Sequence, residues 1–92
     1  MSDPPVRARV VVRGRVQGVF FRAEAHARAS SLGLAGRVRN LPDGSVEADF
    51  EGRRDLVEWM ISWCGRGPSG ASVEDVRVEW EEPRGTRGYS IG

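Results

Sequence analysis

GRVQGVFFR, residues 14–22, is the stretch from which the rest of the 92-residue chain can be worked out. It leaves an apolar segment, turns through two glycines and enters a helix-like segment. Backbone amides in such a turn can converge on an anion, and the positive end of the following helix adds to the attraction. Arg22 brings a permanent charge and a planar fork of donors. The pattern indicates a phosphate-binding loop, although the residues alone also fit an ordinary strand-to-helix connection.

Hydrophobic periodicity divides the rest of the chain into strands and helices. Period-two alternation with β-branched residues predicts strands, and apolar residues at helical spacing predict helices. The predicted elements are strand 6–13, helix 21–32, strands 35–41 and 45–51, helix 54–64, strand 73–82 and a short strand within 88–92. This order predicts an α+β, ferredoxin-like βαββαβ sandwich. We expect an antiparallel sheet of order 4-1-3-2, optionally extended by a short C-terminal edge strand, with two helices on one face.

Charged side chains occupy the outward positions of these strands. Arg37 and Arg39 are expected to face acids of the next strand across a hairpin, in pairs that fix the register. The sheet face that carries these charges is expected to stay in contact with solvent. The inward residues of the strand over 73–82 are expected to be Val76, Val78 and Trp80.

Size and composition limit the classes of protein to which this chain can belong. The chain predicts a disordered tail of residues 1–5 and one domain over residues 6–92. Its 14 basic residues, all arginine, nearly balance 13 acids, which argues against a nucleic-acid partner. No apolar run approaches the roughly 20 residues that span a bilayer, and the N-terminus lacks the apolar core of a signal peptide. With a single cysteine, nothing requires an oxidising compartment, so we expect the protein in the cytoplasm. We also expect a monomer.

Three segments together resemble the acylphosphatase family: GRVQGVFFR at 14–22, GRVRN at 36–40, and Gly67-Pro68. The resemblance covers nearly the whole chain and implies hydrolysis of acyl phosphates without a cofactor or a metal. It implies that Arg22 binds the phosphate and that Asn40 orients the attacking water. The expected substrate-binding residues are those of the loop: Gly14, Arg15, Val16, Gln17, Gly18, Val19 and Phe20. Inorganic phosphate, sulfate or chloride would be expected to occupy the same loop.

The residue types at this site are compatible with that substrate class. A carboxylate leaving group, with a conjugate acid of pKa about 4, departs without a proton donor. Positioning and charge stabilisation then suffice for phosphoryl transfer. The alternative interpretation is a ferredoxin-like module that binds RNA or an anion, or that regulates, without catalysis.

Other conspicuous residues are expected to be structural. GRGPSG at 65–70 matches the G-x-G-x-x-G pattern, but it follows a helix, whereas a dinucleotide loop follows a strand. His26 is expected to face solvent or pack against a neighbour. Cys64 falls on the apolar stripe of its helix and is expected to be a buried thiol. The three tryptophans are expected to belong to the core and its rim.

Overall fold

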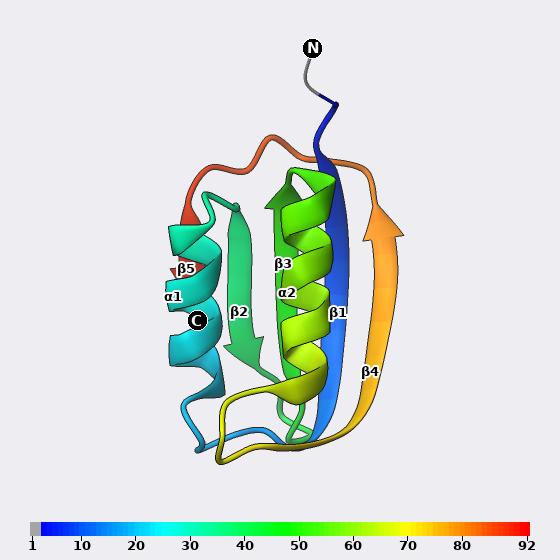
Figure 1. Cartoon of the computed structure of the whole chain (residues 1–92). Coiled ribbons are helices and arrows are strands. Elements are labelled where there is room, and N and C mark those ends of the chain that lie inside the picture. Colours follow the sequence, from blue (N-terminus) through cyan, green and yellow to red (C-terminus); the bar gives the residue numbers. More distant parts are fainter. Residues whose placement is uncertain (1–2) are drawn as a thin grey trace.

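A computed structural model describes residues 3–92, and its elements follow the predicted order (Figure 1). They are strand β1 (Val6–Arg15), helix α1 (Phe21–Ser31), strand β2 (Gly36–Asn40), strand β3 (Val46–Gly52), helix α2 (Arg54–Arg66), strand β4 (Ser72–Glu81) and strand β5 (Tyr89–Ile91). The prediction of five strands and two helices is therefore confirmed, with boundaries that differ by a few residues. The largest differences are that β1 runs on to Arg15 and α2 to Arg66.

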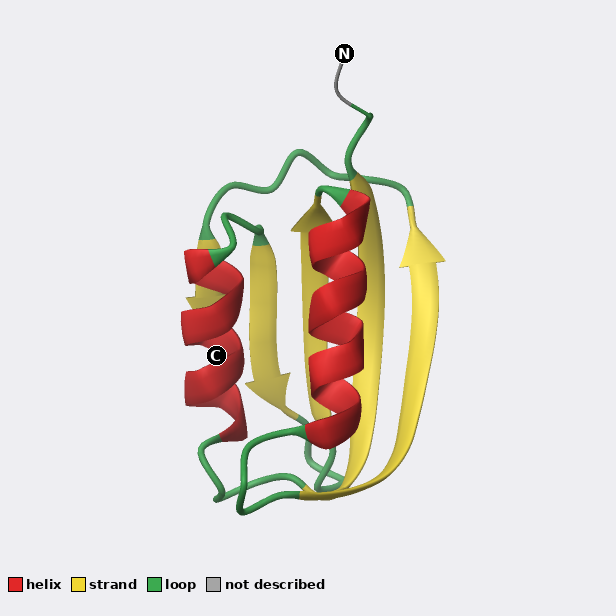
Figure 2. Ribbon diagram, in the orientation of Figure 1, coloured by secondary structure: helices red, strands yellow, loops and turns green. Residues whose placement is uncertain are grey.

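The sheet has the order β4-β1-β3-β2-β5. The β4–β1, β1–β3 and β3–β2 pairs are antiparallel, as predicted, whereas β5 pairs with β2 in parallel. Both helices lie on the same face of the sheet (Figure 2). The ferredoxin-like prediction is confirmed, and the optional C-terminal edge strand exists. The parallel pairing matters for the site because it brings the last residues of the chain beside β2.

The core lies between this sheet face and the two helices. The inward row of β1 is fully buried at Val10 and Val12, opposite inward residues of β3. Helix α1 contributes small alanines and Phe21, whose ring lies 5.1 Å from that of Trp63 on α2. Small residues on α1 let it approach the sheet closely. The first turn of α1, which carries Phe21 and Arg22, is thereby held in a defined position.

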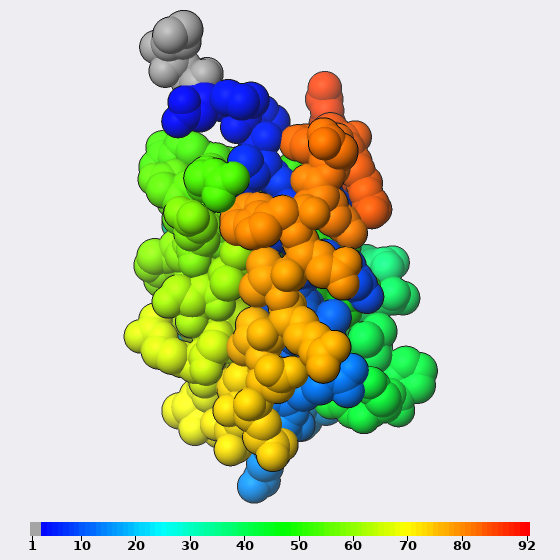
Figure 3. All heavy atoms as spheres, turned by 90° about the vertical axis from the view of Figure 1, so that its right-hand side faces the viewer, coloured from blue at the N-terminus to red at the C-terminus, as the bar shows by residue number. Residues whose placement is uncertain are grey.

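The inward row of β4 differs from expectation in its burial. The register with β1 places Val76, Val78 and Trp80 on the helix-facing side, as predicted. However, Val78 remains 37% exposed and Trp80 47% exposed. Strand β4 is one of the two edge strands of the sheet, and the space-filling view shows this edge open, with α2 along one side of it (Figure 3). The guanidinium of Arg54 lies 4.7 Å from the Trp80 ring centre and covers part of it.

The charged face of the sheet is less open than expected. Arg39 pairs with Glu47 across the β2–β3 hairpin, at 2.9 Å, as predicted. Arg7 and Glu51, in contrast, are only 3% and 5% exposed, so the expectation of a solvent-covered face is wrong at these positions. The segment between β4 and β5 covers them: the backbone amides of Arg84 and Gly85 donate hydrogen bonds to Glu51.

The predicted N-terminal tail is only partly described. Met1 and Ser2 lie outside the described residues. Residues 3–5 are exposed and form neither helix nor strand. The division into a tail of residues 1–5 and a domain of residues 6–92 stays a prediction. Within residues 3–92, no helix is long and apolar enough to cross a membrane.

Candidate active site

The connection between β1 and α1 is shorter than the sequence pattern indicated. Gly14 and Arg15 belong to β1, where the pairing with β4 shifts register after Arg13. A Cβ atom on Gly14 would lie 2.2 Å from the carbonyl oxygen of Ser72. Gly14 is therefore required by the close approach of β4. The loop proper comprises residues 16–20.

Backbone amides at this loop are available as donors. Among residues 3–92, no protein acceptor is found for the amides of residues 17–20. The first helical hydrogen bond of α1 runs from the Glu24 amide to the Phe20 carbonyl, at 3.0 Å. The three amides before Glu24 consequently have no acceptor within the helix, and Phe20 provides no side-chain cap. The N-terminus of α1 thus offers donors and the positive end of the helix dipole together.

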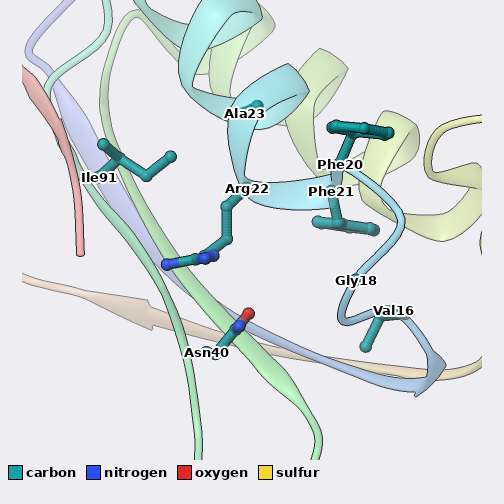
Figure 4. A pocket seen from close by; sticks show the side chains of 8 residues that line it. All are labelled: Val16, Gly18, Phe20, Phe21, Arg22, Ala23, Asn40 and Ile91. Carbon is teal, nitrogen blue, oxygen red and sulfur yellow. The ribbon is translucent and has the colours of Figure 1, made fainter.

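A pocket of about 250 Å³ opens beside these amides (Figure 4). It is bounded by the loop, the first turn of α1, the end of β2 and β5. Arg22 and Asn40, the two residues expected to carry the chemistry, both line it, which confirms the prediction that Asn40 points to the helix-covered side of the sheet. The lining residues are Val16, Gly18, Phe20, Phe21, Arg22, Ala23, Asn40 and Ile91.

Asn40 ends β2 with an unsatisfied side-chain oxygen. Its backbone pairs with Val46, and its Oδ1 atom is buried without a hydrogen-bond partner among the described residues. A buried acceptor left in this way costs about 1–3 kcal/mol. Such an atom, placed in a pocket, is suited to accept a hydrogen bond from a bound water.

Arg22 reaches across the pocket from the first turn of α1. Its Nη1 donates a hydrogen bond to the carbonyl oxygen of Gly92, while the Gly92 amide donates to Val38, at 2.8 Å. No carboxylate belongs to the pocket lining among the described residues. The guanidinium therefore faces no acidic side chain in the pocket and keeps several further donors for an anion.

His26 lies one turn after Arg22 and also contacts β5. Its Nε2 atom lies 3.1 Å from the Tyr89 carbonyl oxygen. Because a carbonyl can only accept, the imidazole donates in this bond. His26 is half-buried and does not line the pocket. Its position corresponds to the packing role expected for it, and it attaches β5 to α1.

Not every residue expected in the substrate-binding loop reaches the pocket. Gly14, Arg15, Gln17 and Val19 are not among its lining residues. The Gln17 side chain instead donates to the carbonyl oxygens of Leu41 and Ser45, each at 2.9 Å. These two hydrogen bonds link the loop to the turn that follows Asn40. They therefore hold the loop and Asn40 in a defined position relative to each other.

Three lining residues were missed from the sequence: Phe21, Ala23 and Ile91. The first two flank Arg22 in the first helical turn, and their proximity in sequence was a usable signal. The sequence around Ile91 offered no such signal, because the position of Ile91 at the pocket depends on the parallel pairing of β5 with β2.

Other reactive groups lie away from the pocket. Cys64 is fully buried, as predicted, and burial raises the pKa of its thiol to about 12. It is therefore protonated at neutral pH and cannot act as a thiolate nucleophile. The described part of the chain brings together no cluster of three or more histidine, cysteine or acidic side chains that could hold a metal ion.

Comparison with known proteins identifies the family. The sequence profile of the acylphosphatase family matches residues 8–91. The chain belongs to the acylphosphatase family. The acylphosphatase of Nostoc sp. is 60% identical over 86 residues, which cover 94% of this chain and 85% of the relative. The acylphosphatase of Aeropyrum pernix is 59% identical, covering 99% of this chain and 92% of the relative.

Solved structures agree with this assignment. An acylphosphatase from Coxiella burnetii superposes with a TM-score of 0.91 at 34% identity, covering 96% of this chain and 93% of the other. The acylphosphatase of Bacillus subtilis gives a TM-score of 0.90 at 33% identity, covering 95% and 98%. The resemblance inferred from the three sequence segments is thus confirmed for the family and for the fold.

Proposed function

We propose that this chain is an acylphosphatase whose pocket binds the phosphoryl group with Arg22 and loop amides and aligns the attacking water with Asn40. The observation that carries the proposal is the pocket itself. It combines the guanidinium of Arg22 and backbone amides with a buried acceptor, and neither the amides of residues 17–20 nor this acceptor has a partner within residues 3–92. The acylphosphatase family, to which the chain belongs, supports the substrate class.

The proposed reaction is a single displacement at phosphorus. The water oxygen forms a bond to phosphorus, and the bond between phosphorus and the acyl oxygen breaks. The carboxylate leaves with the electron pair, and a phosphoryl oxygen of the substrate accepts the water proton. Arg22 and the amides stabilise charge on the phosphoryl oxygens in the transition state, which is the main requirement of phosphoryl transfer.

The pocket residues match a substrate with a good leaving group. A carboxylic acid has a pKa of about 4, so the leaving carboxylate needs no proton at neutral pH. Among the described residues, the pocket lining contains no histidine, acidic or cysteine side chain that could protonate a poorer leaving group or attack phosphorus directly. A simple phosphate ester requires such help. We therefore infer that mixed carboxylic–phosphoric anhydrides are hydrolysed and that no covalent enzyme intermediate forms.

The direct test is hydrolysis of benzoyl phosphate by the purified protein and by two variants of Asn40. We expect Asn40→Ala to lower kcat by about 10²–10³-fold, the usual effect of removing one donor or orienting group, with little change in phosphate affinity. Asn40→Asp places a negative charge in the same space, so it should weaken phosphate binding as well. Wild-type rates for Asn40→Ala would remove Asn40 from the mechanism.

Two controls separate this proposal from its alternatives. Full activity is expected in a strong chelator, and loss of activity there would call for a metal. Inorganic phosphate is expected to inhibit competitively, as are sulfate and chloride if they occupy the loop. A binding module without catalysis would instead bind phosphate, or single-stranded RNA in a salt-dependent manner, without any turnover.

We also propose that the protein acts as a cytoplasmic monomer, without nucleic-acid or membrane partners. The near balance of arginines and acids supports the part of the proposal that concerns nucleic acid. Analytical ultracentrifugation at two protein concentrations tests the oligomeric state. Formation of a dimer would raise the sedimentation coefficient at the higher concentration.

A further inference from the structure

The pocket has an apolar half that the chemistry at phosphorus does not use. Arg22 and Asn40 are its only polar lining residues within the described part of the chain. The remaining lining includes the side chains of Phe20, Phe21 and Ile91. Figure 4 shows Phe20 and Ile91 on opposite sides of the pocket, with the Arg22 side chain between them. A ligand held by Arg22 therefore has apolar surface on two sides.

Phe20 is unusual in both backbone and side chain. Its φ of 64° and ψ of 19° lie in the left-handed region, and no other non-glycine residue among residues 3–92 has a positive φ. This conformation is costly for a bulky side chain, and glycine or asparagine adopts it more readily. The Phe20 side chain is also 78% exposed. An aromatic ring here contributes little to the core and adds strain to the backbone.

Strain combined with exposure at a pocket is a sign of function, because only the surrounding structure or a ligand makes such an arrangement useful. Ile91, on the other side of the pocket, is 47% exposed as well. The two residues are far apart in sequence, and the pairing of β5 with β2 places Ile91 at the pocket that Phe20 also lines. Two exposed apolar side chains thus flank the guanidinium of Arg22.

We propose that Phe20 and Ile91 form the binding site for the acyl group, and that Phe20 makes the protein selective for acyl phosphates with a bulky apolar or aromatic acyl group. This inference rests on the proposed function. An acyl phosphate has a charged phosphoryl end and an acyl end. The phosphoryl end matches the charged half of the pocket at Arg22, and the acyl end matches the apolar half at Phe20 and Ile91. An aromatic acyl group packs against the Phe20 ring and removes apolar surface of both from water.

The test uses stable analogues, so that binding is measured apart from turnover. Benzoylphosphonate and acetylphosphonate replace the scissile oxygen by a direct carbon–phosphorus bond, and orthophosphate lacks the acyl group. Isothermal titration gives the affinity of each for the wild type and for Phe20→Asn. Asparagine tolerates the left-handed conformation, so this variant removes the ring and keeps the backbone. Phe20→Tyr keeps the ring, and Trp59→Gln removes an exposed aromatic side chain outside the pocket.

We expect Phe20→Asn to weaken benzoylphosphonate binding by about tenfold, near the lower limit for a hydrophobic contact in a specificity pocket. Acetylphosphonate should change less, and orthophosphate should bind as in the wild type. Trp59→Gln should leave all three affinities unchanged, and Phe20→Tyr, which keeps the ring, should retain the preference for benzoylphosphonate over acetylphosphonate. In turnover, the ratio of kcat/KM for benzoyl phosphate to that for acetyl phosphate should fall by the same factor.

The outcomes separate this proposal from the proposed function. The proposed acyl site would be overturned if Phe20→Asn lowered the affinity for all three ligands equally. It would also be overturned if the affinity for benzoylphosphonate did not fall. A wild type that binds benzoylphosphonate more tightly through Phe20, yet does not hydrolyse benzoyl phosphate, would support the acyl site and refute the hydrolysis. The denaturant midpoint of Phe20→Asn should not fall, because the exposed ring contributes little to stability.

Discussion

Arg7 and Arg22 are the same residue type in opposite situations. Arg7, on the charged face of the sheet, is 3% exposed and lies within 2.9–3.3 Å of three carboxylates, those of Asp49, Glu51 and Glu81. Arg22, at the pocket, has one hydrogen-bond partner among residues 3–92, the backbone oxygen of Gly92, and no acidic side chain pairs with it. Acidic side chains surround the first guanidinium, whereas no acidic side chain among residues 3–92 pairs with the second.

This difference shows how one small fold keeps structural and functional charges apart. Removing a charge from water is costly unless counter-charges surround it, so Arg7 can be buried only within its acidic cluster. Arg22 stays near solvent, where its charge is tolerable without a carboxylate and can be used for an anion. The sheet separates the two regions, so that the acids serving Arg7 do not repel a phosphate bound at Arg22.

The largest effect on stability is expected for Arg7→Ala. Removing one partner of a buried ion pair typically costs about 3–5 kcal/mol, because the remaining charges are left uncompensated. Urea unfolding measures the change. Arg77→Ala is the matched control, since Arg77 is 74% exposed beside Asp75 and exposed pairs contribute at most about 1 kcal/mol. Equal losses for the two variants would remove the distinction between buried and exposed arginines.

Arg22→Ala is expected to show the converse behaviour. Losing the guanidinium should reduce kcat/KM for benzoyl phosphate by about 10²–10³-fold, equivalent to about 2.7–4 kcal/mol of transition-state stabilisation. Phosphate affinity should fall as well. The free energy of unfolding should change little, because the Arg22 side chain makes a single hydrogen bond within residues 3–92, the one to Gly92. A variant that loses stability but keeps its activity would reverse the comparison between Arg7 and Arg22.

The pH dependence of stability should follow Glu51. Burial alone would raise the pKa of Glu51, but hydrogen bonds from the Arg84 amide, Arg7 and the Gly85 amide outweigh burial and lower it. A lowered pKa means that the carboxylate stabilises the fold above its unfolded pKa of about 4.3. This contribution is lost as the pH falls through the folded pKa.

Glu51→Gln tests this contribution to the Arg7 cluster. At pH 7 we expect a loss of about 1.5–3 kcal/mol, the range for hydrogen bonds to a charged group. The loss should shrink as the pH falls from the unfolded pKa of about 4.3 through the lower pKa of the folded state, because the carboxyl of the folded wild type then becomes protonated too. Burial raises the pKa of Asp49. The contribution of Asp49 to the free energy of unfolding should therefore change with pH in the direction opposite to that of Glu51. A loss independent of pH would show that the Glu51 charge is unimportant.

The smallest effect is expected for His26→Ala, on the Arg22 side of the molecule. The variant loses one hydrogen bond to the Tyr89 carbonyl, which is worth about 0.5–1.5 kcal/mol. Urea unfolding measures this loss, and hydrogen exchange at the Gly36 amide, which donates to Gly88, reports whether β5 has loosened. His26→Gln keeps a side-chain donor and should recover part of the protection. Unchanged exchange in His26→Ala would mean that β5 is held without this bond.

Much of the fold and part of the site could be predicted because their signals are local. Alternation in residues 6–13 and 45–51 identified strands, and the stripe through Val57 and Cys64 identified a helix. The parity of Asn40 with Val38 placed it on the helix-covered face, since side chains alternate along a strand. The burial of Arg7 and the exposure of Trp80 could not be predicted in this way. They depend on which segment crosses a strand and on how far a helix reaches over the sheet.

By itself, the sequence determined the order of elements, the family, and a loop with Arg22 at the start of a helix. Only the tertiary structure decided that β5 runs parallel to β2, which places Ile91 at the pocket and Gly92 against Arg22. It also decided that Gly14 and the side chain of Gln17 support the loop from outside the pocket. The physical reason is that periodicity and turn residues depend on neighbours in the chain, whereas a pocket is made by packing between segments that are distant in sequence.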